Sequence, residues 1–262
     1  MLYPVFGELL PDVNELFQWK AIFAPDSILA FNKTALLALV STVICIAIFV
    51  VGMRRPALVP TGVQNAAEMG YSFVEDQIAV QVMGVEAGKK WAPFLGTLFF
   101  WIFFINIWEV IPLVQFPATS RIAIPFLMAT IVFFLYIIVG FMNQGLHYIP
   151  NSIFPPGVPK ALLPLVALIE VFSKFFMRPF SLAIRLFANM VAGHVLLSVF
   201  AIMTNELIVK HDSSPIQIVL GVLPLVGLIA LTALELLVAL LQAYIFSILT
   251  AVYLAESIHP EH

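Results

Sequence analysis

The sequence predicts an all-α polytopic membrane protein with about five transmembrane helices and one amphipathic helix on the cytoplasmic surface. Of its 262 residues, 62% are hydrophobic and only 10% are charged, whereas a soluble domain has roughly 25% charged residues. Stretches with few or no charges recur along the chain, and about 20 apolar residues suffice to cross the hydrocarbon core of a bilayer. These crossings must be helices, because isolated strands cannot satisfy their backbone hydrogen bonds in lipid.

The elements are expected to form one membrane domain over residues 1–262. In chain order they are an external N-terminal segment (1–30), span 1 (31–53), a surface amphipathic helix (64–86), span 2 (91–113), span 3 (122–144), a long helix 4 (161–205) and a long helix 5 (215–256). The N-terminal segment carries Glu8, Asp12 and Glu15 and does not begin with a basic stretch. It therefore does not resemble a cleavable signal peptide.

Basic residues in the short loops predict the orientation of the spans. Arg54 and Arg55 follow span 1, and Lys89 and Lys90 precede span 2, whereas the link between spans 2 and 3 carries only Arg121. Loops rich in lysine and arginine remain in the cytoplasm. With five spans, we expect the N-terminus outside and the C-terminus in the cytoplasm.

The segment between spans 1 and 2 shows helical amphipathicity. Its apolar residues recur at spacings of three or four with acids between them, at Ala67, Tyr71, Val74, Ile78 and Val82. This pattern is typical of a helix that lies on a membrane surface. Residues 145–160 contain four prolines and are expected to form a connecting loop.

Helices 4 and 5 are too long to stand upright in a bilayer. Each covers more than 40 residues, and a rise of 1.5 Å per residue gives about 60 Å, twice the hydrocarbon thickness of about 30 Å. We expect strong tilt, or kinks near Pro164, Pro179 and Pro224. Because tilt must be stabilised by packing, a large partner in the membrane is expected.

Both long helices carry polar residues at positions that lipid disfavours. At 100° per residue, one side of helix 4 collects Lys174, Arg178, Ser181, Arg185 and Asn189. Arg185 is the most unfavourable of them, since a charge at the bilayer centre costs from about 2.5 to more than 10 kcal/mol. Helix 5 carries a second polar stripe at Glu235, Gln242 and Tyr253. Both stripes are expected to face protein or water.

Plainer interpretations of the charged residues stay open. Lys174 and Arg178 lie near the expected cytoplasmic end of helix 4 and could extend to lipid headgroups. Arg185 could form a purely structural ion pair with Glu235. Glu109, near the end of span 2, could simply reach the outer interface.

The uncharged polar residues also have plainer interpretations. His194 lies nine residues beyond Arg185, about 180° round an ideal helix, and could be a hydrogen-bonded histidine of the core. Asn189 and Gln242 could only hydrogen-bond between helices.

Several classes of function are excluded. The net charge of −3 provides no basic patch for nucleic acid. The single cysteine, Cys45, excludes an internal disulfide or a cysteine metal cluster, and neither a metal nor a cofactor is expected. No GxxxxGK[ST] sequence occurs, so chemistry on ATP has no phosphate-binding loop here.

Two strings of the sequence resemble subunit a of the F-type ATP synthase. They are RPFSLAIRLFANMVAGH, beginning at Arg178, and LLQAYIFSILTAVYLAESIHPEH, beginning at Leu240. The piece NIWEVIP around Glu109 falls where that family carries an acidic residue before a proline. With the span number and the topology, the resemblance covers essentially the whole chain.

The resemblance implies roles for these residues. Arg185 matches the essential stator arginine that faces the rotating ring of subunit c, and Asn189 matches the asparagine that lines the channel beside it. Gln242 matches the glutamine that packs near the arginine. His194 and Glu235 match a titratable pair that some family members hold in the opposite order.

The implied function is proton translocation by a non-catalytic membrane subunit. Arg185 would separate an entry and an exit half-channel, because arginine stays charged at physiological pH and favours the ionised form of a nearby carboxylate. Glu235 and His194, with Glu109 near the outer opening, would deliver protons, and Ser181 belongs to the same path. The expected partners are the subunit c ring, the peripheral-stalk subunit b, the rest of the complex and lipid, in a bacterial plasma membrane.

Two other classes of function compete with this interpretation. A secondary ion-coupled transporter would also place charges at mid-membrane, but it usually carries internal repeats, and no convincing repeat relates residues 34–144 to 161–256. A non-transporting scaffold would explain tilted helices but neither a lone arginine nor a lone glutamate at depth.

Overall fold

The computed structural model describes residues 32–54, 57, 59–111, 114–116, 118–154, 159, 162–209 and 215–258. Within these residues every regular element is a helix, and five helices are long and apolar enough to cross a membrane. The prediction of an all-α polytopic membrane protein with about five spans is therefore confirmed. The predicted external segment 1–30 lies outside the described residues.

The first half of the described chain contains span 1 and the region up to span 3. Its elements are α3 (Lys33–Met53), α4 (Val63–Val74), the π-helical η1 (Glu75–Val80), α5 (Gln81–Met83), α6 (Val85–Asn106), and the 3-10 turns η2 (Ile107–Glu109) and η3 (Ala118–Ser120). The side chain of Asn32 caps α3 by accepting a hydrogen bond from the backbone N–H of Ala35 at 2.9 Å. This cap satisfies one of the free N–H groups at the helix start.

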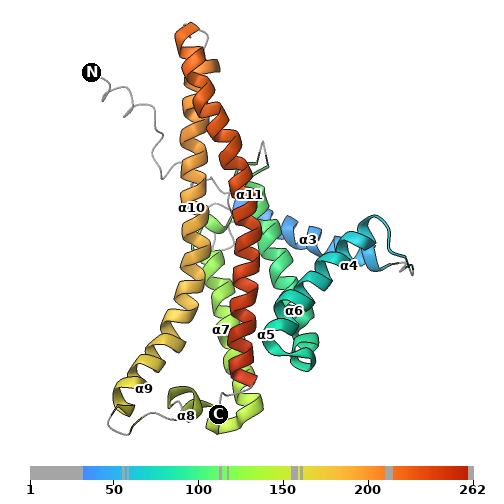
Figure 1. Cartoon of the computed structure of the whole chain (residues 1–262), viewed down its shortest axis with the longest axis vertical. Coiled ribbons are helices and arrows are strands. Elements are labelled where there is room, and N and C mark those ends of the chain that lie inside the picture. The colour runs from blue at the N-terminus through green and yellow to red at the C-terminus, as the bar shows by residue number, and fades with distance from the viewer. Residues whose placement is uncertain are drawn as a thin grey trace.

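The second half contains the long helices. Its elements are α7 (Ala123–Gln144), the 3-10 turn η4 (Gly145–His147), α8 (Tyr148–Ile153), α9 (Leu163–Phe172), the π-helical η5 (Ser173–Met177), α10 (Arg178–Thr204), the π-helical η6 (Asn205–Val209) and α11 (Pro215–Ile258). In Figure 1, α10 and α11 run side by side, with α7 next to them and α4 to α6 on one flank.

The break between the surface helix and span 2 falls at Gly84, earlier than the predicted boundaries of 64–86 and 91–113. Gly84 has φ +78°, a left-handed conformation that glycine adopts readily and that ends α5. The chain then reverses so that α6 packs against η1. Gly88 permits this approach, because a Cβ there would lie 2.7 Å from Cα of Val80.

The predicted apolar stripe of the surface helix faces the protein. Ala67, Val74 and Ile78 are buried, whereas Asp76 and Gln77 are exposed. The stripe packs against α6, and its later part also contacts α11. The amphipathic pattern therefore reflects the packing of this helix against the membrane-spanning helices.

The long helix that begins at Leu163 bends where α9 meets α10 (Figure 1). At this point η5 has the π-helical pattern, and the backbone N–H of Arg178 donates to the carbonyl of Ser173, five residues back. Pro179 follows directly and has no N–H to donate. A proline of this kind and a π-helical turn are two recognised causes of helix bending.

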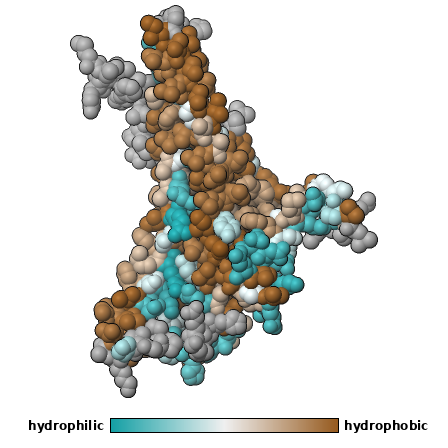
Figure 2. Space-filling model, viewed as in Figure 1, coloured by the Kyte–Doolittle hydropathy of each residue, from teal (hydrophilic) through white to brown (hydrophobic). Residues whose placement is uncertain are grey.

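The core lies where α6, η1, α7, α10 and α11 meet. Its largest fully buried side chains include Leu95, Ile102, Leu186, Met190 and Leu254. Much of the outer surface is apolar as well, and Figure 2 shows this apolar surface over the upper part of the α10–α11 pair. A hydrophilic strip runs along α10 below it. An apolar exterior of this extent suits lipid and not water.

Candidate functional site

Three of the predicted site residues meet in one buried cluster. Glu109, at the end of η2, is 2% exposed; His194, on α10, is 8% exposed; and Glu235, on α11, is 6% exposed. His194 Nδ1 lies 4.0 Å from Glu109 Oε1. We call Glu109, His194 and Glu235, which come from three distant parts of the chain, the acid–histidine cluster.

Gly193 allows Glu235 to reach this cluster. The carboxyl group of Glu235 lies so close to the backbone of Gly193 that a Cβ at position 193 would collide with both carboxyl oxygens. Only glycine fits here without displacing the carboxyl group. The position of the Glu235 carboxyl group against α10 therefore depends on a missing side chain at residue 193.

Two further buried polar residues, Asn106 directly before η2 and Thr119 in η3, carry no recognisable sequence motif. Asn106 and Thr119 are buried, and Thr119 Oγ1 donates to Asn106 Oδ1 at 2.7 Å. Asn106 lies three residues before Glu109, on the same side of the helical turn, so this spacing could have identified it. Thr119 lies in a separate 3-10 turn, and no sequence signal places it there.

Several buried polar atoms of this region have no hydrogen-bond partner among the described residues. They are Nδ2 of Asn106, Oε1 of Glu109 and Oε2 of Glu235. Burying such groups without partners is costly, and buried polar groups in proteins commonly bond to ordered water. The region is therefore chemically suited to hold water and to exchange protons.

Lys33 ties Val114 and Phe116, which precede η3, to the start of α3. Its ammonium group donates to the carbonyl of Val114 at 2.9 Å and lies 5.1 Å from the centre of the Phe116 ring. Lys33 also acts electrostatically on His194. Val114 and Phe116 are thereby held beside the start of α3.

Arg185 lies apart from the acid–histidine cluster. It is half-buried on α10, between the exposed Ser181 and the exposed Asn189. Within the described residues its guanidinium group forms no hydrogen bond and no ion pair, neither with Glu235 nor with another acid. The plainer interpretation of a structural pair with Glu235 therefore has no support. Gln242, the remaining predicted site residue, is buried on α11.

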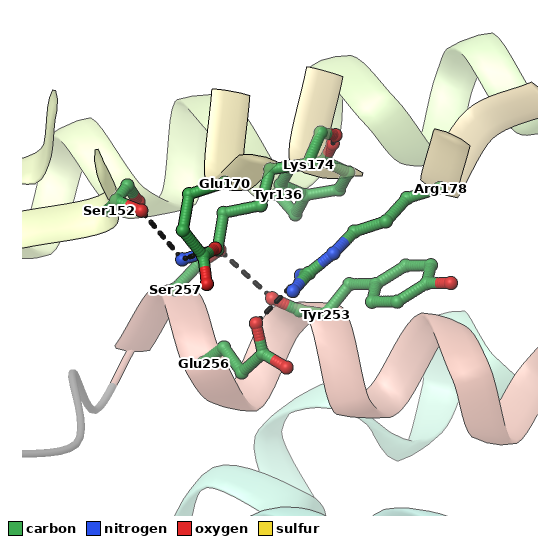
Figure 3. A network of polar contacts seen from close by, with 8 residues as sticks. All are labelled: Tyr136, Ser152, Glu170, Lys174, Arg178, Tyr253, Glu256 and Ser257. Carbon is green, nitrogen blue, oxygen red and sulfur yellow. Dashed lines mark hydrogen bonds and ion pairs between the residues drawn. The ribbon is translucent and has the colours of Figure 1, made fainter. Parts of the chain in front are cut away.

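Lys174 and Arg178 have protein partners, contrary to the interpretation that they extend to headgroups. Figure 3 shows them in a polar network at the end where α11 finishes. Lys174 pairs with Glu170 at 3.2 Å and donates to the carbonyl of Ser152 at 2.7 Å. Arg178 pairs with Glu256 at 2.6 Å across two helices.

This arrangement defines a class of protein: a multi-pass α-helical membrane protein with titratable groups buried among its spans and a cation on a helix face that the described residues leave partly exposed. Intramembrane ionisable residues of this kind mark ion paths.

Comparison with known proteins specifies the family. The sequence matches the ATP synthase A chain family over residues 35–255. It is 39% identical to ATP synthase subunit a of Rhodococcus erythropolis over 91% of this chain and 89% of that protein. It is 44% identical to that of Gluconacetobacter diazotrophicus over 88% of this chain and 89% of that protein. It is 41% identical to ATP synthase subunit a of Frankia alni over 95% of this chain and 86% of that protein.

The chain belongs to the ATP synthase subunit a family, the proton-translocating stator subunits of F-type ATP synthases. The resemblance noted in the sequence is thereby confirmed. The protein is a component of the ATP synthase complex, and its bacterial relatives and apolar helices indicate a multi-pass protein of a bacterial plasma membrane.

Proposed function

We propose that this chain forms entry and exit half-channels against a rotating ring of subunit c and that Arg185 separates them. The observation that carries this proposal is the placement of Arg185. It lies on a face of α10 that the described residues leave uncovered, with exposed Ser181 and Asn189 beside it and no ion-pair partner among those residues. A partner carboxylate supplied by another subunit would complete the pair.

The physics of this pair suits a motor. Arginine keeps its charge when buried, whereas lysine is neutralised more readily. At 4 Å and an effective dielectric constant of about 20, the attraction between guanidinium and carboxylate is roughly 4 kcal/mol. That energy is comparable with the roughly 2.3 kcal/mol that each proton gains per 100 mV. The ring carboxylate can thus lose its proton beside Arg185 without being held there permanently.

The acid–histidine cluster is the candidate entry path. Its three titratable side chains and the unpartnered polar atoms around Asn106 support a hydrated route towards the middle of the membrane. Asn189 and Gln242 are proposed to line the region nearest Arg185, and Ser181 the side towards the exit. The Lys174 and Arg178 network would flank the exit.

The orientation follows from the basic residues at one side of the spans. Arg54 ends α3, and Lys89 and Lys90 lie in the first turns of α6, so this side is proposed to be cytoplasmic. The N-terminus then lies outside, the C-terminus lies in the cytoplasm, and Glu109 at the far end of α6 lies towards the outside.

The chain is proposed to have no catalytic role in making ATP. Its partners are proposed to be the subunit c ring on the uncovered face of α10, the peripheral-stalk subunit b, and lipid on the apolar exterior. These assignments follow the resemblance and the exposed surfaces of the long helices.

Replacement of the arginine tests the proposal. Arg185→Ala should abolish coupled ATP synthesis while the complex still assembles, because the two half-channels lose their separating charge. Lys89→Gln, which removes an exposed cation of α6, serves as the control and should behave like the parent. ATP-driven proton pumping at the parent rate in assembled Arg185→Ala complexes would refute the assignment.

A further inference from the structure

The polar network in Figure 3 fastens the end of the molecule where α11 finishes. Arg178 Nη1 lies 2.6 Å from Glu256 Oε2, and the guanidinium carbon lies 4.9 Å from the centre of the Tyr253 ring. The Arg178 side chain is only 18% exposed, although that of Glu256 is 41% exposed. We call this contact between α10 and α11 the Arg178 clasp.

The clasp sits where the hydrogen-bond pattern of the long helix changes, between η5 and α10. The backbone N–H of Arg178 bonds five residues back to Ser173, and Pro179 cannot donate at all. A π-helical turn and a proline in succession leave the direction of α10 poorly defined by α9. Side-chain contacts within and after this turn must therefore set the direction of α10.

Side chains fasten the turn itself and the helix after it. Within it, Lys174 donates to the carbonyl of Ser152 on α8, and its own carbonyl accepts from the hydroxyl of Tyr136 on α7. After it, Arg178 reaches Glu256 and Tyr253 on α11. The first set holds α9 and η5, and the clasp holds the start of α10.

The clasp is geometrically coupled to Arg185. Arg185 follows Arg178 by seven residues, which is two turns, about 10.5 Å along the axis and within about 20° of the same face. The helix between them is regular and packs through the buried Leu182 and Ala183. A rotation or shift of the first turn of α10 is thus passed on to Arg185. Tyr253 lies within electrostatic range of both arginines.

We propose that Arg178, through Glu256 and Tyr253, is a positioning residue that fixes the start of α10 and so holds Arg185 at its working place against the ring. This inference rests on the proposed role of Arg185. Arginine suits the clasp because its planar group can pair with a carboxylate and stack on a ring at once, whereas lysine can only supply charge.

Charge exchange tests the clasp. Arg178→Glu and Glu256→Arg should each lower ATP synthesis per assembled complex by roughly three- to tenfold, because each reversal removes the attraction of a partly exposed pair and adds a repulsion of similar size. The double exchange should return the rate to within about threefold of the parent. Lys89→Glu, which reverses an exposed cation of α6, is the matched control and should have no effect. A double exchange as impaired as the single changes would overturn the proposal.

A second readout reports position. In a Cys45→Ala background, Ala188→Cys places a thiol on the exposed face of α10 beside Asn189. Its cross-linking to the carboxylate-bearing helix of the ring should fall in Arg178→Glu and recover in the double exchange. Parent-level cross-linking in assembled Arg178→Glu complexes would also overturn the proposal, because a general loss of stability does not move this readout selectively.

Milder variants cover the case in which charge reversal prevents assembly. Arg178→Gln and Glu256→Gln should each reduce coupling, and the double change should be no worse than the more impaired single change, because both remove one contact. Additive losses would refute the clasp. Arg178→Lys should retain part of the activity. Failure of the proposed function is seen separately, as coupling that survives Arg185→Ala.

Discussion

Gly193→Ala is the sharpest test of how the proposed entry path is built. The added Cβ would collide with the carboxyl group of Glu235, so this change displaces a predicted proton carrier without altering any titratable residue. Both residues lie in regular helix, Gly193 in α10 and Glu235 in α11. The carboxyl group, at the end of a flexible side chain, is the part that can move.

The expected magnitude follows from two opposed effects. Forcing an extra carbon into a packed site costs about 1–3 kcal/mol, whereas alanine favours a helix by about 1 kcal/mol over glycine. The free energy of unfolding should therefore fall by about 2 kcal/mol or less. The higher helix propensity of alanine does not restore the position of the displaced carboxyl group. We therefore expect the full cost of about 1–3 kcal/mol to be added to the barrier for proton entry, which slows entry by about 5- to 150-fold.

Passive proton flux through the membrane sector, driven by an imposed potential in vesicles, measures this effect. Gly227→Ala is the matched control, because its Cβ would collide with the apolar ring of Phe200. It should lower stability similarly and leave proton flux nearly unchanged. Adding Glu235→Asp to Gly193→Ala should recover part of the flux, since the shorter side chain makes room. Parent-level flux in assembled Gly193→Ala, or an equal loss in Gly227→Ala, would refute the reasoning.

Two further predictions concern the same region. Making His194 or Glu235 apolar should slow proton entry by roughly tenfold or more, because a positioned carrier is lost; near-parent passive flux in both variants would support a structural role instead. Asn106→Ala should lower the free energy of unfolding by about 1–3 kcal/mol, because the buried hydroxyl of Thr119 loses its acceptor. The double variant Asn106→Ala/Thr119→Val should lose less free energy of unfolding than the two single variants lose together. Thermal unfolding of the purified complexes measures these losses.

Much of the fold could be predicted because its causes are local. An unbroken run of apolar residues is enough to require a membrane helix, so the all-helical fold with five candidate spans could be predicted. The break at Gly84 was harder to place, because it depends on a left-handed glycine and on the close approach of Gly88 to Val80. Neither the backbone conformation of Gly84 nor the contact of Gly88 produces a repeating pattern of residue types in the sequence.

The candidate site, like the fold, could be predicted from the sequence only in part. The depth of Arg185 and Glu235 in apolar sequence identified both as unusual, and spacing around the helix separated Arg185 from His194. The meeting of His194 with Glu109 and the part played by Thr119 could not be predicted, because these residues come from separate elements. The sequence alone allowed Arg178 to extend to lipid headgroups, whereas in the structure Arg178 pairs with Glu256.

By itself the sequence determined that this chain spans a membrane, that a permanent charge lies within it, and which family it resembles, because hydropathy and short motifs are properties of neighbouring residues. Only the tertiary structure decided which buried polar groups share a cluster, which carboxyl group lies against Gly193, and what holds the start of α10. Those properties depend on distances between helices far apart in the chain, and side-chain packing sets those distances.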